Sequence, residues 1–390
     1  MRKLTKIFSY VLVAVLASFI TFSAMGTPAA GEGDAASAAK LAELEQLIDT
    51  YFIEEPDFGA LEDAAATAMV DALGDRWSYY MTAADYVAYL EQMQNAYVGI
   101  GITITVTEDQ TGFEVLKVNE GGPAEEAGML AGDIITAVEG QSVNGMTTTQ
   151  ARDLVRGEEG TKVALTVRRG EESMEMLVTR KTVQTPVAAY QMLEDNIGLV
   201  TIYNFDARCA EETITSIEAL LEQGAQALIF DVRNNPGGYK KELVKILDYL
   251  LPEGPLFHSV DYQGKVAVDE SDAKCLEIPM AVLVNGDSYS AAEFFAAALD
   301  EYDAAIVVGQ QTTGKGYFQN TYRLSDGSAV GLSVGRYTTP NGVCLADVGL
   351  TPDLVVEVDE ELFWQIYYGN VAWNEDPQVL AAVELLKNAE

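Results

Sequence analysis

Histidine, cysteine and basic residues are all scarce in this chain of 390 residues. His258 is the only histidine, so a serine–histidine catalytic pair would have to use it. The three cysteines, Cys209, Cys275 and Cys344, are isolated and lack CxxC spacing, which argues against a disulfide framework and against a zinc site. The sequence has neither a P-loop nor a nucleotide fingerprint, and we therefore expect no cofactor and no metal.

The charge balance excludes one class of partner. Lysine and arginine number 24 against 60 aspartate and glutamate residues, which gives a net charge of −36. Such a chain is repelled by nucleic acid, so we expect no nucleic-acid partner. Solubility alone is a sufficient reason for the acidic excess. The hydrophobic fraction of 48% is ordinary for a globular protein, and the length suits two or three domains.

The N-terminus has the pattern of an export signal. Arg2, Lys3 and Lys6 precede an uncharged apolar run from Ile7 to Met25. This run is longer than the apolar core of a cleaved signal, which is about 7–15 residues, and it approaches the roughly 20 residues that span a bilayer. We expect residues 1–26 to be a signal sequence or membrane anchor, with the anchor favoured, and residues 27–38 to be a linker. The remaining chain would then be extracytoplasmic.

Residues 39–95 carry apolar side chains at helical spacing and predict an N-terminal helical region. Thr82 is a candidate N-cap within it. No catalytic constellation appears there, so packing or formation of a homodimer is the expected role. A C-terminal helical tail is predicted over residues 361–390, and Asp376-Pro377 is a helix start within it. Four aromatic residues of this tail either form an oligomer contact or pack onto their own core: Phe363, Trp364, Tyr367 and Tyr368.

Residues 96–183 alternate short strands with turns. The stretch GGPAEEAGMLAGDIITAVEG, residues 121–140, resembles a PDZ domain, which implies a β-rich fold with short helices. In that family a Gly-x-Gly-x turn offers backbone N–H groups to the terminal carboxylate of a peptide, which adds as a strand. The matching turn is Gly99, Ile100, Gly101 and Ile102, and Ala151, Leu154 and Val155 on the following helix would line the groove. The alternatives are turn geometry for the glycines and core packing for the helix residues.

Residues 184–360 alternate strand and helix and predict a largely parallel α/β sheet. Two loops follow buried apolar runs, NGDSYS after AVLV and GQQTTGKG after AIVV. They carry Ser290 and Lys315. Turns of this kind gather at one sheet edge, where sites form. A third turn, RNNPGG, ends in Gly237 and Gly238, which permit close backbone approach to a ligand.

These motifs, in this order after a PDZ pattern, resemble the S41 family, and within it the carboxyl-terminal processing peptidases, or tail-specific proteases. The resemblance runs from about Leu47 to Val358. It implies a multidomain α/β protein with a crotonase- or ClpP-like protease core, located in the bacterial cell envelope. The family motif at the nucleophile is usually Ser-Ala-Ser-Ala-Ser-Glu, and residues 288–293 read SYSAAE. The attacking serine is kept as Ser290, whereas Tyr289 and Ala292 depart from the motif.

The resemblance also assigns the base. The family's Phe-Gly-Lys-Gly motif appears as TGKG, which places Lys315 25 positions after Ser290, and Gln319 matches the glutamine beside the lysine. A lysine acts as a base only as the free amine, and burial can lower its pKa from about 10.4 by several units. If residues 315–319 are extended, Lys315 and Gln319 share one face. The amide of Ala291, at a helix start, and that of Gly237, preferred over Gly238, would hold the oxyanion.

Each residue alone also has a plain structural role, because Ser290 suits a helix N-cap and Lys315 a solvated surface lysine. Three functions remain. The first is an extracytoplasmic serine endopeptidase that acts on proteins or peptides with free C-termini. The second is a catalytically inactive PDZ scaffold, which the presence of serine, lysine and glutamine disfavours. The third is a crotonase-like acyl-CoA enzyme, which the PDZ segment and the export signal disfavour.

Overall fold

The computed structural model describes residues 32–388 and divides the chain into two compact units, residues 1–69 and 70–390. The signal sequence or anchor that we expected over residues 1–26 lies outside the described residues. Within them, no helix combines the length and the apolar character needed to cross a bilayer. The division between the units falls inside the segment 39–95 that we expected to be one helical region.

The first unit contains helix α2 (Glu32–Tyr51) and most of helix α3 (Phe58–Asp71). The start of α2 lies inside residues 27–38, which we expected to be a linker, so the helix is longer than predicted. Asp57 begins α3, because its Oδ1 accepts a hydrogen bond from the N–H of Ala60 at 3.1 Å.

The second unit begins with a short strand that the sequence did not predict. Strand β1 (Tyr79–Met81) lies between α3 and helix α4 (Ala83–Met93) and pairs with a strand formed some 250 residues later. The prediction of helix alone for residues 39–95 was therefore wrong at this point. The predicted N-cap is confirmed, since Thr82 accepts a hydrogen bond from the N–H of Asp85 at 3.2 Å.

The PDZ-like segment forms a sheet of its own with strand order β3-β4-β5-β7-β8 and β6 paired to β5. Every second residue of β7 is buried, which is the period of a strand with one face on the core. Its strands are β3 (Ile102–Val106), β4 (Phe113–Val118), β5 (Ile134–Val138), β6 (Gln141–Ser142), β7 (Lys162–Arg169) and β8 (Glu172–Thr179). Its helices are α5 (Pro123–Glu126) and α6 (Thr148–Val155).

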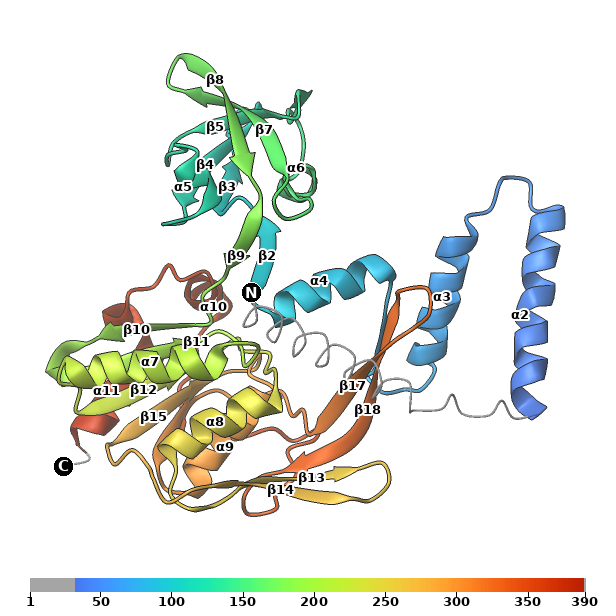
Figure 1. The fold of residues 1–390 in the computed structure, drawn as a ribbon. Helices are drawn as coiled ribbons and strands as arrows, with labels where there is room; N and C mark the ends of the chain where they lie inside the picture. Colours follow the sequence, from blue (N-terminus) through green and yellow to red (C-terminus); the bar gives the residue numbers. More distant parts are fainter. Residues whose placement is uncertain (1–31, 389–390) are drawn as a thin grey trace, which may run out of the picture. The chain divides into compact units, whose positions relative to one another are not determined.

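A two-stranded ribbon connects this sheet to the rest of the second unit (Figure 1). Strand β2 (Ala96–Gly99) pairs antiparallel with β9 (Lys181–Gln184). Directly below the ribbon, the N–H of Thr185 donates to the carbonyl of Asn95 at 2.8 Å. The chain therefore leaves for the PDZ-like sheet and returns from it at one place.

The predicted parallel sheet is confirmed. Its strand order is β10-β11-β12-β15-β16-β19, and only the edge strand β10 runs antiparallel to its neighbour. The connections from β11 to β12, from β12 to β15 and from β15 to β16 each contain a helix, as crossovers between parallel strands usually do. The strands are β10 (Ala188–Met192), β11 (Ile197–Ile202), β12 (Ala227–Asp231), β15 (Met280–Val284), β16 (Ala305–Gly309) and β19 (Leu354–Val355).

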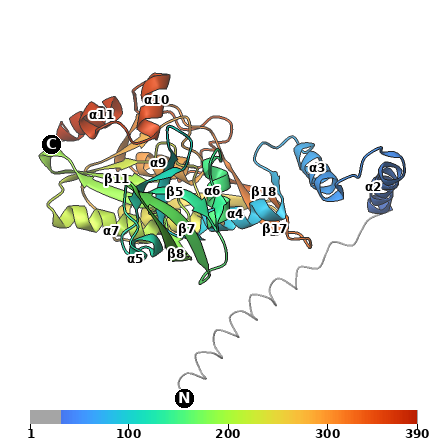
Figure 2. The same cartoon turned by 90° about the horizontal axis from the view of Figure 1, so that it is seen from above.

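Both faces of this sheet are covered, and alternate residues of β12 show it. Leu228 and Phe230 belong to a core shared with α7 (Cys209–Glu222), α8 (Lys240–Leu250) and α9 (Ala291–Glu301). Ala227 and Ile229 belong to a second core, shared with α11 (Pro377–Lys387). Figure 1 shows the resulting layers, and in Figure 2 the strand β11 lies between α7 and α11. The sheet is hydrophobic on both faces, as its apolar strands predict.

A second, antiparallel sheet completes the core and was not predicted. Its order is β1-β18-β13-β14, with β17 paired to β18. The strands are β13 (Gly254–Asp261), β14 (Val266–Ser271), β17 (Tyr317–Arg323) and β18 (Ala329–Thr338). Because Lys315 lies two residues before β17, this sheet fixes where the lysine loop ends.

The predicted C-terminal helices are confirmed as α10 (Glu360–Tyr367) and α11. Asp376 begins α11 as expected, accepting hydrogen bonds from the N–H groups of Gln378 and Val379 at 3.0 and 3.3 Å. Its other oxygen pairs with the buried Arg233 at 2.8 Å. Since Arg233 starts the glycine turn, this pair fixes the turn against the helix. The aromatic residues of α10 contact one another, and Trp364, Tyr367 and Tyr368 remain largely exposed.

Candidate active site

Ser290 lies in the turn between β15 and α9, where a buried strand gives way to a helix. Its φ of 57° and ψ of −123° are unusual for a residue with a side chain. Such strain is typical of a nucleophile held on a sharp strand-to-helix turn, and it persists only where the surroundings enforce it. The turn presents Ser290 to a cleft of about 730 Å³.

The glycine turn packs directly against this serine. A Cβ on Gly237 would lie 2.7 Å from the Cβ of Ser290 and 2.8 Å from the nitrogen of Ala291, and the φ of Gly237 is 90°. Only glycine fits at that distance and in that conformation. The two loops that the sequence singled out are therefore in contact.

The hydrogen bonds of the turn distinguish its two glycines. The N–H of Gly237 donates to Oδ1 of Asn235 at 2.9 Å, so it is already used. Phe205 donates to the carbonyl of Gly237 and accepts from the N–H of Tyr239, both at 2.8 Å, which turns the N–H of Gly238 away from Phe205. Among residues 32–388, this N–H of Gly238 makes no hydrogen bond. Of the two glycines, Gly238 is therefore the one with a backbone N–H free to bind an oxyanion. This is the reverse of our preference from sequence, which was Gly237.

Lys315 is half-buried and lines the same cleft as Ser290. Its burial lowers the pKa of the amine to about 8, although the nearby charges of Glu293 and Asp75 act in the opposite direction. In the described part of the chain no hydrogen bond joins its Nζ to Oγ of Ser290. The amine instead lies over two aromatic rings, 4.8 Å from the ring centroid of Trp77 and 5.7 Å from that of Tyr289.

Glu293 joins the serine helix to the lysine loop. Its side chain is fully buried, and Oε2 accepts from the N–H of Ser290 at 3.0 Å and from the N–H of Lys315 at 2.8 Å. Oε1 accepts from the N–H of Gly314 at 2.7 Å and from the hydroxyl of Thr312 at 2.5 Å. Four donors satisfy this carboxylate in a place where an unpaired charge would be costly. We did not assign Glu293 a role from sequence, although the motif at residues 288–293 ends with it.

Gln319 lies in the cleft but makes no hydrogen bond to Lys315 in the described structure. Its Nε2 donates to Oγ of Ser333 at 3.0 Å and to the carbonyl of Tyr317 at 3.3 Å. The register of β17 against β18 shifts between Phe318 and Gln319. The pairs Phe318–Gly335 and Gln319–Ser333 skip Val334, so the extra residue lies on β18 and the alternation along β17 continues. Lys315 and Gln319 line the same cleft, as the shared face predicts.

His258 lies on β13, and its Nε2 is 3.2 Å from the carbonyl oxygen of Pro340. It lines a neighbouring hollow of about 930 Å³, together with Asp75, Arg76 and Trp77. His258 does not line the cleft that contains Ser290. The loop before β1 is a contributor to which we assigned no role from the sequence, although it lies within the range, from about Leu47 to Val358, over which the family resemblance runs.

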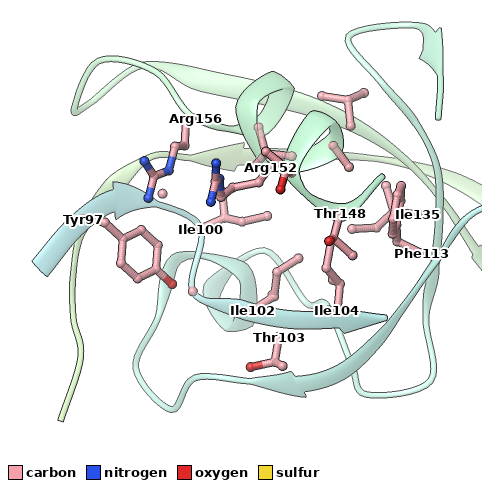
Figure 3. Close-up of a pocket in the computed structure, with 16 residues that line it drawn as sticks. Tyr97, Ile100, Ile102, Thr103, Ile104, Phe113, Ile135, Thr148, Arg152 and Arg156 are labelled. Atoms are coloured by element: carbon pink, nitrogen blue, oxygen red, sulfur yellow. The ribbon is translucent and has the colours of Figure 1, made fainter. Parts of the chain in front are cut away.

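The second candidate site is a groove of about 390 Å³ between β3 and α6 (Figure 3). Gly99, Ile100, Gly101 and Ile102 line it as expected. The carbonyls of Ile100 and Gly101 accept from the N–H groups of Ala124 and Asn119, at 2.9 and 3.0 Å. Within the described chain the N–H groups of Ile100 and Gly101 make no hydrogen bond. These two N–H groups are therefore free to donate hydrogen bonds to a ligand in the groove.

The helix side of the groove agrees with the sequence in part. Ala151 and Val155 line it, whereas Leu154 is absent from the lining and packs against the PDZ-like core. Arg152 and Arg156 also line the groove, where Figure 3 shows both guanidinium groups on the helix side. Arg152 pairs with Asp153 and Arg156 with Glu91 of α4.

Comparison with known proteins places the chain in a family. The model of peptidase family S41 matches residues 196–356, and the PDZ domain model matches residues 114–169. The carboxy-terminal processing protease CtpA of Bacillus subtilis is 32% identical over 373 residues, which cover 92% of this chain and 79% of that protein. The chain belongs to peptidase family S41.

A second relative, a probable CtpA-like serine protease of Staphylococcus aureus, is 30% identical over 83% of this chain and 66% of its own length. A solved structure, a putative S41 protease from Bacteroides fragilis, has a TM-score of 0.55 at 16% identity, covering 87% of this chain and 93% of that one. That likeness concerns the fold alone. Taken with the family matches, this chain is a serine-type peptidase of the C-terminal processing kind with a PDZ domain. Residues 32–388 contain no cluster of three side chains that could hold a metal ion.

Proposed function

We propose that this peptidase cuts peptide bonds with Ser290 as nucleophile and Lys315 as general base, and that its PDZ domain recognises the free C-terminal tail of the substrate. The observation that carries the proposal is the connection made by Glu293. One buried carboxylate holds the backbones of both Ser290 and Lys315 at the rim of one cleft. A lowered lysine pKa, at about 8, supports the role of base near neutral pH.

In this mechanism Oγ of Ser290 attacks the carbonyl carbon of the scissile bond while its proton passes to the neutral amine of Lys315. The tetrahedral intermediate then collapses, and the lysine ammonium gives the proton to the departing amine nitrogen. Water hydrolyses the acyl-enzyme in the second half, with Lys315 again accepting the proton. Gln319, whose Nε2 donates to Ser333, would orient the amine of Lys315 from the β17 side of the cleft.

The oxyanion would be held by two backbone donors. The N–H of Ala291 is the first of helix α9, where the helix dipole favours negative charge. The N–H of Gly238 is the second, chosen in place of Gly237 because the N–H of Gly237 already donates to Asn235. One such donor contributes about 3–4 kcal/mol to lowering the barrier.

Tail recognition would use the groove between β3 and α6. The turn of residues 99–102 would bind the terminal carboxylate through free N–H groups, and the peptide would pair with β3 as an added strand. Ala151 and Val155 would contact its last side chain. Leu154 is left out of the groove because it packs on the core.

We further propose that residues 1–26 tether the protein to the membrane, with residues 27–31 as linker and the catalytic part extracytoplasmic in the cell envelope. The PDZ domain would extend over residues 96–183 and the protease core over residues 184–360. A homodimer is part of the proposal, formed through the helices of residues 39–95 or through the C-terminal tail of residues 361–390. The exposed aromatic residues of α10 support the second contact.

A fluorophosphonate probe separates a peptidase from an inactive PDZ scaffold. Wild-type protein should be labelled at Ser290, and Ser290→Ala should not be labelled at all. A wild-type protein that binds free-acid peptides in the PDZ groove yet resists the probe across the pH range would be a scaffold. Binding of coenzyme A thioesters without labelling would favour a crotonase-like enzyme.

A further inference from the structure

The amine of Lys315 lies against two aromatic rings from distant parts of the chain. The ring centroids of Trp77 and Tyr289 lie 4.8 and 5.7 Å from its Nζ, and the two rings lie 5.9 Å apart at an interplanar angle of 33°. Both distances are within the roughly 6 Å over which an aromatic face attracts a cation. We call Trp77 and Tyr289 the aromatic pair.

Trp77 forms a wall between two spaces. Lys315 and Tyr289 line the cleft that contains Ser290, whereas Trp77 lines the neighbouring hollow of about 930 Å³. A smaller residue at position 77 would therefore open the amine of Lys315 toward the water of that hollow. In the described structure, no other side chain that lines this hollow contacts the amine through its ring.

The loop that carries Trp77 is fastened to both sides of the site. The N–H of Trp77 donates to Oδ1 of Asp75 at 3.1 Å, and the hydroxyl of Ser78 accepts from the N–H of Ser333 at 3.1 Å. The guanidinium of Arg76 donates to the carbonyl of Thr313 in the lysine loop at 3.4 Å. The last two contacts cross more than 230 positions of sequence, and together the three hold the loop of Trp77 in place.

Tyr289 reaches the same amine from the serine side. Its N–H donates to the carbonyl of Asn235 at 3.1 Å, so the glycine turn fixes its backbone. The motif that residues 288–293 resemble usually has alanine at this position. The bulky ring is thus a property of this chain, and it contributes cover that an alanine would not give.

The charges around Lys315 do not by themselves favour a neutral amine. The carboxylates of Glu293 on α9 and Asp75 before β1 both act to raise the pKa of Lys315. Burial and, to a lesser extent, the charge of Asp287 raise the pKa of the neighbouring Tyr289. Arg76 lies 4.4 Å from the ring of Trp77. Cation–π attraction also favours the charged amine. Because the pKa nevertheless falls to about 8, the exclusion of water outweighs the two carboxylates.

We propose that Trp77 and Tyr289 are positioning residues of the catalytic centre, whose rings hold the amine of Lys315 in the cleft and close it off from water. The segment that precedes the PDZ domain is then a working part of the active site. This inference rests on the assignment of Lys315 as the base.

The test measures the rate at which a fluorophosphonate labels Ser290 in the full chain as a function of pH. Tyr289→Ala and Trp77→Ala should each move the midpoint of the rate about one pH unit upward, because water gains access to the amine. At about pH 7.5 labelling should slow roughly tenfold, while at high pH it should return close to the wild-type rate. Loss of rate at every pH would instead mean that the ring has only a structural role, and it would overturn the proposal.

Three controls sharpen the result. Tyr289→Phe keeps the ring and should keep the wild-type midpoint. Tyr262→Ala removes an exposed ring that lines the same hollow as Trp77, and it should leave the midpoint unchanged. If Trp77→Ala fails to fold, Tyr289→Ala, which restores the usual residue of the motif, decides alone. An unchanged or lowered midpoint in Tyr289→Ala would refute the proposal. Lys315→Ala that labels like wild type would refute the base assignment itself.

Discussion

The catalytic cleft and the PDZ groove both combine a glycine turn with a helix, but their charges are arranged differently. In the groove, Arg152 and Arg156 each pair with a carboxylate, and the rest of the lining is largely aliphatic. In the cleft, Lys315 has no carboxylate within ion-pair distance among the described residues, and the buried Asp206 has no cation. The cations of the groove are thus paired, whereas Lys315 and Asp206 in the cleft have no ion-pair partner among the described residues.

This difference has a physical reason. A pKa moves far from its ordinary value only where a charged group loses water without gaining an adequate partner. Lys315 meets that condition beneath the rings of Trp77 and Tyr289, and Asp206 meets it because one carboxyl oxygen is buried without a hydrogen bond. In the groove, by contrast, Arg152 and Arg156 pair with Asp153 and Glu91.

The largest expected effect separates chemistry from binding. Ser290→Ala and Lys315→Ala should each reduce peptide cleavage by about 10⁴-fold or more, because the serine loses its reacting atom or its base. Both variants should bind a tail peptide as wild type does, since neither residue lines the groove. Cleavage assays and peptide titration on the same preparations measure the two effects.

His258→Ala is the matched control for this prediction. Its side chain contacts Pro340 outside the cleft, so cleavage should stay near the wild-type rate. A large loss of activity in His258→Ala with an unchanged melting temperature would contradict the lysine assignment.

A smaller effect should come from changes at the PDZ groove. Amidation of a substrate's C-terminus removes the charge that the free N–H groups of Ile100 and Gly101 would bind. Hydrogen bonds to a charged group contribute about 1.5–3 kcal/mol, so kcat/KM should fall about 10- to 100-fold. The loss should appear in KM, with turnover at saturation little changed. Equal kcat/KM for the acid and the amide would rule out carboxylate capture.

A separate effect, on stability rather than on activity, concerns Asp206. Burial raises the pKa of Asp206 to about 7, above the ordinary value of the unfolded chain. The folded state therefore holds a proton that the unfolded state releases, and stability falls as pH rises from about 4 to about 7. Asp206→Asn removes this loss, so it should gain about 2–4 kcal/mol relative to wild type between about pH 4.5 and about pH 8.

Urea unfolding of both proteins at the two pH values measures this difference. The informative quantity is the change with pH in the difference in unfolding free energy between the two proteins. Its value at a single pH is less informative, because the side-chain amide of Asp206→Asn introduces hydrogen-bond donors of its own. A difference between the two proteins that does not change with pH would show that Asp206 is ionised throughout.

Sequence reasoning identified the parts of this site that lie within short motifs. Ser290 at a helix start, the glycine turn beside it and the parallel sheet all follow from local patterns of apolar runs and turn residues. The groove turn of residues 99–102 is of the same kind. Each depends on residues close in sequence, where periodicity and turn chemistry are informative.

The remaining parts depend on contacts that no local pattern contains. The Trp77 loop reaches Lys315 across more than 230 positions, and β1 was hidden inside a helical region because its partner is β18. The choice between Gly237 and Gly238 turned on the side chain of Asn235, two residues away but visible only in three dimensions. Lys315 and Gln319 line the same cleft, but the hydrogen bond of Gln319 to Ser333 comes from the pairing of β17 with β18, which no local pattern contains.

The central claim is that Lys315 activates Ser290, and the pH dependence of Ser290 labelling in the wild-type protein tests it most directly. The account predicts a labelling rate that rises through a single midpoint near 8, where the amine of Lys315 loses its proton, and then levels off. Lys315→Ala should label only marginally at every pH. A midpoint near 6.5, the ordinary pKa of histidine, or a rate that Lys315→Ala leaves unchanged, would contradict the claim.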